Sequence, residues 1–141
     1  MYNYRQFMDE EFNNMINNNI MNNSLSLYTP EEGYNKGNMF SNLYDGYKNY
    51  KPVNLEGRDN KTKLWLELNR VLFALHELNL YLDVNPNNTS MIQLFSDYRK
   101  KAVELMNEYE KNYGPLTTLS EANSSATFNW IENFPWEGGN N

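Results

Sequence analysis

The stretch of sequence that decides the fold is residues 61–83, which read KTKLWLELNRVLFALHELNLYLD. Within it, apolar residues recur in steps of four and three: Leu64, Leu68, Val71, Leu75, Leu78 and Leu82. Because an α-helix turns once in about 3.6 residues, this spacing predicts a helix with one continuous apolar stripe. Trp65, Leu72 and Phe73 widen the stripe beyond a coiled-coil seam, so we expect the helix to contact more than one neighbour.

A second apolar repeat predicts another helix of similar length. Residues 83–88, DVNPNN, interrupt the first repeat, because proline disfavours helical geometry in the residue before it and Asn suits turns and N-caps. Apolar side chains then return at helical intervals, with Leu94, Tyr98 and Leu105 beside them: Ile92, Phe95, Ala102, Met106, Tyr109 and Tyr113. Gly114 and Pro115 form a stop signal, in which we expect Gly114 to adopt the left-handed conformation.

Two helices joined by a short turn predict an antiparallel αα-hairpin, with helices over about 62–84 and 88–113. In this arrangement one apolar set faces the other: Leu68, Val71, Leu75 and Leu78 against Phe95, Ala102, Met106 and Tyr109. A hairpin of this size cannot bury all of its apolar surface. The chain's own arms, a second copy or a different protein must therefore cover the rest.

The 141 residues suit one small all-α domain with extensions. We divide the chain into an N-terminal arm over 1–60, the hairpin over 61–115, and a polar linker with an aromatic tail over 116–141. The arm is expected to be extended and rich in turns, because glycines punctuate it at positions 33, 37 and 46.

Short helices are expected within this arm. Thr29 can cap a helix that begins with Pro30, and Glu32 completes a capping box, so a helical segment should start at Thr29. Nearer the N-terminus, a weaker helical repeat is interrupted by Asn: Tyr4, Met8, Phe12, Met15 and Ile20.

The charge distribution argues against binding to nucleic acid. The net charge is −6, and the acids gather at both ends of the chain: residues 1–33 hold five acids and one base, and residues 115–141 hold three acids and no base. A nucleic-acid-binding face needs clustered basic residues. The one basic run, Arg99-Lys100-Lys101, is typical of the solvated side of a helix.

The residue inventory leaves little for catalysis. The chain has no Cys and a single histidine, His76, so it offers no thiolate chemistry and no pair of histidines for a metal. We therefore expect a protein that is not an enzyme and that binds neither a metal nor a cofactor. The N-terminus lacks a signal peptide and no apolar run is long enough for a membrane span, which predicts synthesis in the cytoplasm.

Beyond Pro115 the chain is polar until residues 128–137, FNWIENFPWE, where aromatic residues cluster. Large aromatic side chains serve as anchors at interfaces, because each covers much area with few rotatable bonds. This tail is therefore expected to bind a partner. The alternative is that it folds back over the open face of the hairpin.

Several motifs in order resemble the spore coat protein JB (CotJB) family over residues 64–137. They are LNLYLDVNP at 78–86, YRK at 98–100, YEKNYGPL at 109–116, and the aromatic ending WIENFPWE at 130–137. The ending departs from the family's Pro-Trp-Pro-Trp pattern in having one Pro-Trp pair. A shorter segment, residues 28–47, resembles the companion spore coat protein JA (CotJA) through YTPEEGYNKGNMFSNLY at 28–44.

The resemblance implies a structural protein of the bacterial endospore coat, synthesised in the mother-cell cytoplasm. It also implies association with other coat proteins, above all a CotJC-type protein similar to manganese catalases. Two alternatives stay open: a soluble regulatory or chaperone-like subunit of a partner enzyme, and a homo-oligomer.

The expected partner-binding residues are the large apolar side chains of both arms and one tryptophan of the first helix: Tyr28, Pro30, Tyr34, Met39, Phe40, Leu43, Tyr44, Trp65, Phe128, Trp130, Ile131, Phe134 and Trp136.

Overall fold

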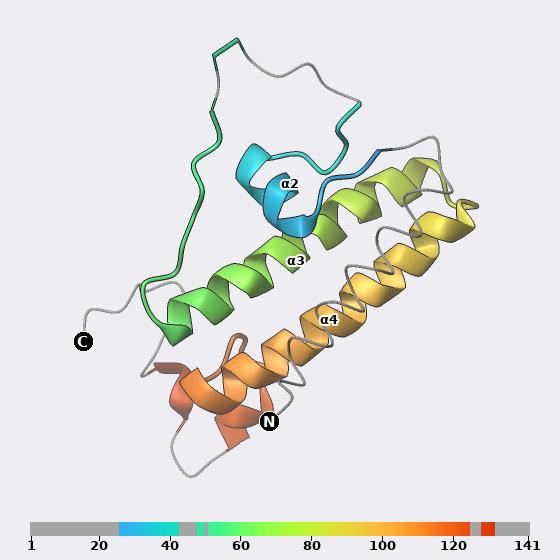
Figure 1. Cartoon of the computed structure of the whole chain (residues 1–141). Coiled ribbons are helices and arrows are strands. Elements are labelled where there is room, and N and C mark those ends of the chain that lie inside the picture. The colour runs from blue at the N-terminus through green and yellow to red at the C-terminus, as the bar shows by residue number, and fades with distance from the viewer. Residues whose placement is uncertain (1–25, 43–47, 50, 125–127, 132–141) are drawn as a thin grey trace, which may run out of the picture.

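The computed structural model describes residues 26–42, 48–49, 51–124 and 128–131. Two long helices, α3 (Asn60–Val84) and α4 (Thr89–Tyr113), run antiparallel, and the short helix α2 (Pro30–Lys36) packs on α3 (Figure 1). Two 3-10 helices, η1 (Glu121–Ser124) and η2 (Asn129–Ile131), follow. The all-α class and the antiparallel hairpin are confirmed. The helix expected around Tyr4 to Ile20 lies outside the described residues.

Polar side chains fix the ends of both long helices close to their predicted positions. Asp59 caps α3, accepting a hydrogen bond of 2.7 Å from the Thr62 backbone N–H. Asn88 caps α4 in the same way, with its side chain accepting from the Met91 backbone N–H at 3.2 Å. A capping side chain satisfies a backbone donor that has no partner within the helix.

The conformation of Gly114 differs from the predicted left-handed one. Its φ of 107° and ψ of 178° are extended with positive φ, a region open almost only to glycine. Pro115 explains the difference, because a proline ring disfavours helical ψ in the preceding residue. The stop signal therefore works as predicted, through a different backbone geometry.

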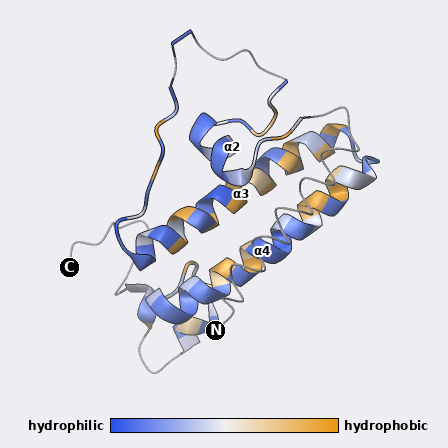
Figure 2. Ribbon diagram, in the orientation of Figure 1, coloured by the Kyte–Doolittle hydropathy of each residue, from blue (hydrophilic) through white to orange (hydrophobic). Residues whose placement is uncertain are grey.

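The core lies between the two helices and under the arm, and Figure 2 shows hydrophobic residues along both α3 and α4. Its buried members on the helices are Leu64, Leu68, Val71, Ala74, Leu78, Met91, Leu94, Tyr98, Ala102, Leu105 and Tyr109. The predicted facing set was partly wrong. Leu75, Phe95 and Met106 are only half-buried, while the centre is made by their neighbours. Wide apolar stripes have no unique midline, so the spacing could not place it.

Helix α2 begins with the predicted capping box. The Thr29 hydroxyl accepts from the Glu32 backbone N–H at 3.3 Å, and the Glu32 carboxylate accepts from the Thr29 N–H at 3.2 Å. Gly33, expected to mark a turn, instead lies buried inside this helix. A Cβ at Gly33 would collide with the Met39 sulfur, so glycine lets the helix approach the segment that follows it.

Burial of tyrosines predicts a loss of stability in alkali. Burial raises the pKa of Tyr98 above its ordinary value of 10.0, and burial with the nearby Tyr113 raises the pKa of Tyr109. The unfolded chain then loses these protons at lower pH than the folded chain, so the folded state loses stability as the pH rises above about 10. Urea unfolding between about pH 8 and 11 should show this fall, and Tyr98→Phe should make it shallower. An unchanged slope in the variant would contradict the prediction.

Candidate partner-binding surfaces

Backbone hydrogen bonds fold residues 26–41 of the N-terminal arm back on themselves. Residues 26–41 double back around α2, with the Tyr28 N–H donating to the Met39 carbonyl at 2.9 Å and the Ser41 N–H donating to the Ser26 carbonyl at 3.0 Å. The Asn38 side chain accepts from the Phe40 N–H and donates to the Phe40 carbonyl, which closes the turn after α2. The described residues 26–42 of the predicted partner-binding arm thus form one folded segment, whose helix α2 packs on α3.

Two expected partner-binding residues of this arm lie in the chain's own interior. Met39 and Phe40 are buried, and the Phe40 ring packs on the Tyr81 ring at a centroid distance of 5.4 Å. The Met39 N–H also lies 3.5 Å from a carboxylate oxygen of Glu77. The sequence alone does not show whether an apolar side chain packs in the core of its own chain or against a partner protein. In this fold the two side chains complete the core.

The remaining described residues of the arm keep part of their surface exposed. Tyr28, Pro30 and Tyr34 are half-buried. The Lys36 ammonium lies 3.7 Å from the centroid of the Tyr28 ring, and the Tyr34 ring meets the edge of Phe73 at 5.8 Å. These three residues therefore keep part of their surface exposed on α2 and just before it. Leu43 and Tyr44 lie outside the described residues.

Arg70 ties three segments together. Its guanidinium forms an ion pair of 2.8 Å with Glu31 of α2 and donates to the Leu55 carbonyl at 3.0 Å. The pair and the Gly57 backbone border a hollow of about 480 Å³. The Arg70 side chain is 17% exposed but that of Glu31 is 56% exposed, so solvent screens the ion pair and its net contribution is about 0–1 kcal/mol. Arg70 thus links α2, α3 and the segment before α3, a role that sequence reasoning missed.

The open end of the hairpin carries an aromatic stack. Trp65 packs on Tyr109 at a centroid distance of 5.4 Å, and Tyr109 packs on Tyr113 at 5.3 Å. Trp65, expected to bind a partner, is half-buried against this stack. Glu110 accepts from the Leu116 N–H at 3.0 Å and folds the chain back after the helix.

The tail leaves large apolar side chains in solvent. The Asn129 side chain donates to the Ala122 carbonyl at 2.8 Å, which joins the two 3-10 helices. Phe128 is 49% exposed, and Trp130 is half-buried. Leu119, which sequence reasoning did not single out, is 93% exposed. Ile131 is the last residue of η2, whereas Phe134 and Trp136 lie outside the described residues.

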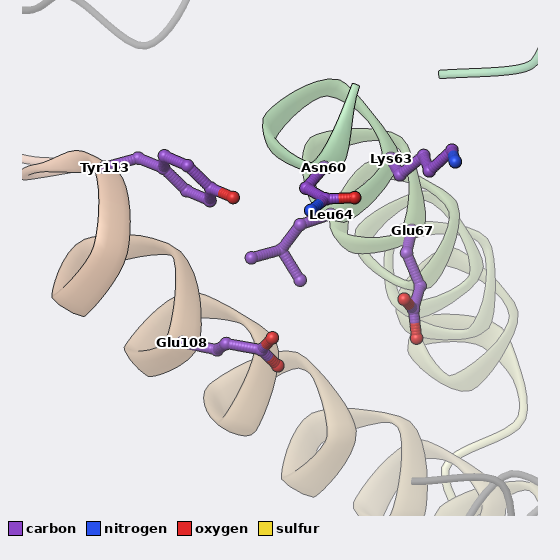
Figure 3. A pocket seen from close by; sticks show the side chains of 6 residues that line it. All are labelled: Asn60, Lys63, Leu64, Glu67, Glu108 and Tyr113. Atoms are coloured by element: carbon purple, nitrogen blue, oxygen red, sulfur yellow. The ribbon is translucent and has the colours of Figure 1, made fainter. Parts of the chain in front are cut away.

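A second hollow of about 460 Å³ lies between the helices near the open end (Figure 3). Its two carboxylates come from opposite helices, Glu67 from α3 and Glu108 from α4. Lys101 pairs with Glu67 at 3.4 Å, so this carboxylate serves the contact between the helices. In the part of the chain that the structure describes, no three His, Cys, Asp or Glu side chains gather as metal ligands.

The hairpin, its docked arm and its exposed aromatic side chains define a small helical-hairpin protein with surfaces suited to protein binding. A family model described as CotJB protein matches residues 62–137, more than half of the chain. The chain belongs to the CotJB family and is thus related to the spore coat. No curated protein and no solved structure matches it. Among the described helices, none is both long and apolar enough to cross a bilayer.

Proposed function

We propose that this chain is a non-enzymatic structural protein of the endospore coat, which binds and assembles partner coat proteins. One observation carries the proposal: Leu119 and Phe128 expose large apolar side chains on a tail that lies outside the packed core. Exposed side chains of this kind gain most when a partner removes them from water. Membership of the CotJB family supports a coat protein as that partner.

The proposed partner is a CotJC-type protein similar to manganese catalases. Any manganese chemistry would then belong to the partner. The family match covers the hairpin and tail but not residues 28–47, so the CotJA-like segment stays a prediction. Tyr28, Pro30 and Tyr34 are its proposed contact residues, because these side chains keep exposed area while Met39 and Phe40 do not.

The same surfaces would also serve a soluble regulatory subunit, and the location of the protein separates the two functions. The chain would be followed by antibody in washed mature spores and in the soluble fraction of the mother cell. We expect it in the coat extract, and we expect less of it there when the gene for the catalase-like partner is deleted. Recovery in the soluble fraction alone would support the regulatory function instead.

A further inference from the structure

Residues 51–57, which we call the strap, are an extended run that leads toward the start of α3 (Figure 1). They belong to no helix or strand, and all of them except Gly57 are exposed. In the part of the chain that the structure describes, the backbone of the strap makes one hydrogen bond, which the Leu55 carbonyl accepts from Arg70 at 3.0 Å. An extended segment with unpaired N–H and C=O groups is a template for pairing with another strand.

Two contacts show which way the strap faces. The Asn54 side chain accepts a hydrogen bond from the Asn35 side chain of α2 at 3.3 Å. Side chains alternate along an extended chain, so those of Val53 and Leu55 point away from α2, which agrees with their exposure of 71% and 43%. The Leu55 carbonyl faces α3, so the backbone N–H and C=O groups of Asn54 and Glu56 face away from α3.

We propose that the strap pairs antiparallel with the strap of a second copy of this chain, about a twofold axis at Asn54. The two Asn54 residues would exchange backbone hydrogen bonds, and the Glu56 N–H of each copy would donate to the Pro52 carbonyl of the other. Val53 of one copy would lie opposite Leu55 of the other, so these exposed apolar side chains cover each other. No like charges come opposite each other in this register.

The strap fits a second copy because the pair is self-complementary and closes. In the pair, the outer edge of each strap faces the α3 helix of its own copy through Leu55 and Arg70, so no edge is left for a third strand. Pro52 lacks an N–H and therefore ends the ladder. A two-stranded ribbon alone is marginally stable, so we expect weak association. This pairing needs no catalase-like partner and goes beyond the proposed function.

Cysteine substitutions test the register in the full chain, which has no Cys of its own. Val53→Cys and Leu55→Cys are placed in separate copies, one of them tagged so that the disulfide dimers separate by mass. Opposite residues that are not hydrogen-bonded have Cα atoms about 4.5 Å apart, whereas equal positions of the two copies would be about 7–8 Å apart. Because a disulfide needs about 4.4–6.8 Å, the mixed dimer should form faster than either equal-position dimer by a factor of about ten or more.

Val84→Cys mixed with Leu55→Cys is the control for chance encounters, because Val84 is 81% exposed at the other end of α3. Equal rates for the mixed dimer of Val53→Cys with Leu55→Cys and for the equal-position dimers would overturn the proposal. A mixed dimer that forms no faster than the control would overturn it too.

Two substitutions of Asn54 supply a second measurement, by sedimentation equilibrium over a range of concentrations. Asn54→Pro removes the N–H that pairs at the axis, whereas Asn54→Ala keeps this N–H and loses the same contact with Asn35. Asn54→Ala should dimerise as the wild type does, and Asn54→Pro should weaken the dimer by a factor of about ten or more. Circular dichroism checks that both variants keep the hairpin.

A wild-type chain that stays monomeric at about 1 mM would overturn the proposal. Equal dimerisation of Asn54→Pro and Asn54→Ala would also overturn it. If Asn54→Pro instead loses binding to the catalase-like partner while its dimer is unchanged, the strap belongs to that partner and the proposal fails.

Discussion

Leu78→Ala is expected to lower the free energy of unfolding by about 2–5 kcal/mol. The Leu78 side chain has 0% exposure and belongs to the core cluster shared by α3, α4 and the arm. Truncation removes buried methyl groups and leaves a cavity. The neighbouring side chains come from α3, α4 and the arm, and close packing lets them relax only partly into that cavity. Denaturant unfolding at neutral pH measures the loss.

Leu80→Ala is the matched control, because it removes the same atoms from the same helix at a side chain that is 50% exposed. Exposed positions usually change stability by less than about 0.5 kcal/mol. Similar losses for the two variants would mean that α3 buries a different face from the one described. Leu75→Ala should fall between them, since Leu75 is half-buried.

Replacing Trp130 and Trp136 together by Ala should weaken binding to the catalase-like partner by at least about 2 kcal/mol, or about thirtyfold. Interface energy concentrates in a few aromatic anchors, and Trp130 stands in η2 beside the exposed Phe128. Titration calorimetry with the purified partner measures the change. Circular dichroism of the same sample shows whether the hairpin remains folded.

Lys111→Gln provides a surface control at an exposed position in the last turn of α4. An exposed charge contributes about 0–1 kcal/mol, so this variant should bind almost as wild type does. If the double tryptophan variant also binds as wild type while folded, the tail packs on its own chain and the proposed interface fails. Deletion of residues 28–47 would be a poor test, because it removes Met39 and Phe40 from the core.

The sequence was sufficient for α2, α3 and α4, because local chemistry defines their ends. Thr29 and Asn88 cap the starts of α2 and α4, and Gly114 follows the end of α4. Each acts through contacts within a few residues, so these roles can be recognised without the tertiary structure. Periodicity likewise revealed that α3 has more than one neighbour. Both inferences depend on patterns that are local in the sequence, although the contacts of α3 with its neighbours are not.

The surfaces were harder to predict because apolar patterning does not say what covers a side chain. Met39 and Phe40 have the composition of interface residues, and only the return of the arm onto Tyr81 shows that they are core. Arg70 was overlooked for a similar reason, since its partners Glu31 and Leu55 are far from it in sequence. Long-range contacts of this kind leave no spacing signal.

The position of the arm ahead of the hairpin has a consequence during translation. Phe40 leaves the ribosome before Tyr81, the ring on which it packs, which is about forty residues later in the chain. Synthesis adds about 5–20 residues per second, so Met39 and Phe40 stay uncovered for about 2–8 s before Tyr81 has been synthesised. The hairpin itself depends on local contacts and closes in well under a second once synthesised. Nascent chains thus expose this apolar segment before α3 is available to cover it, and exposed apolar segments favour association.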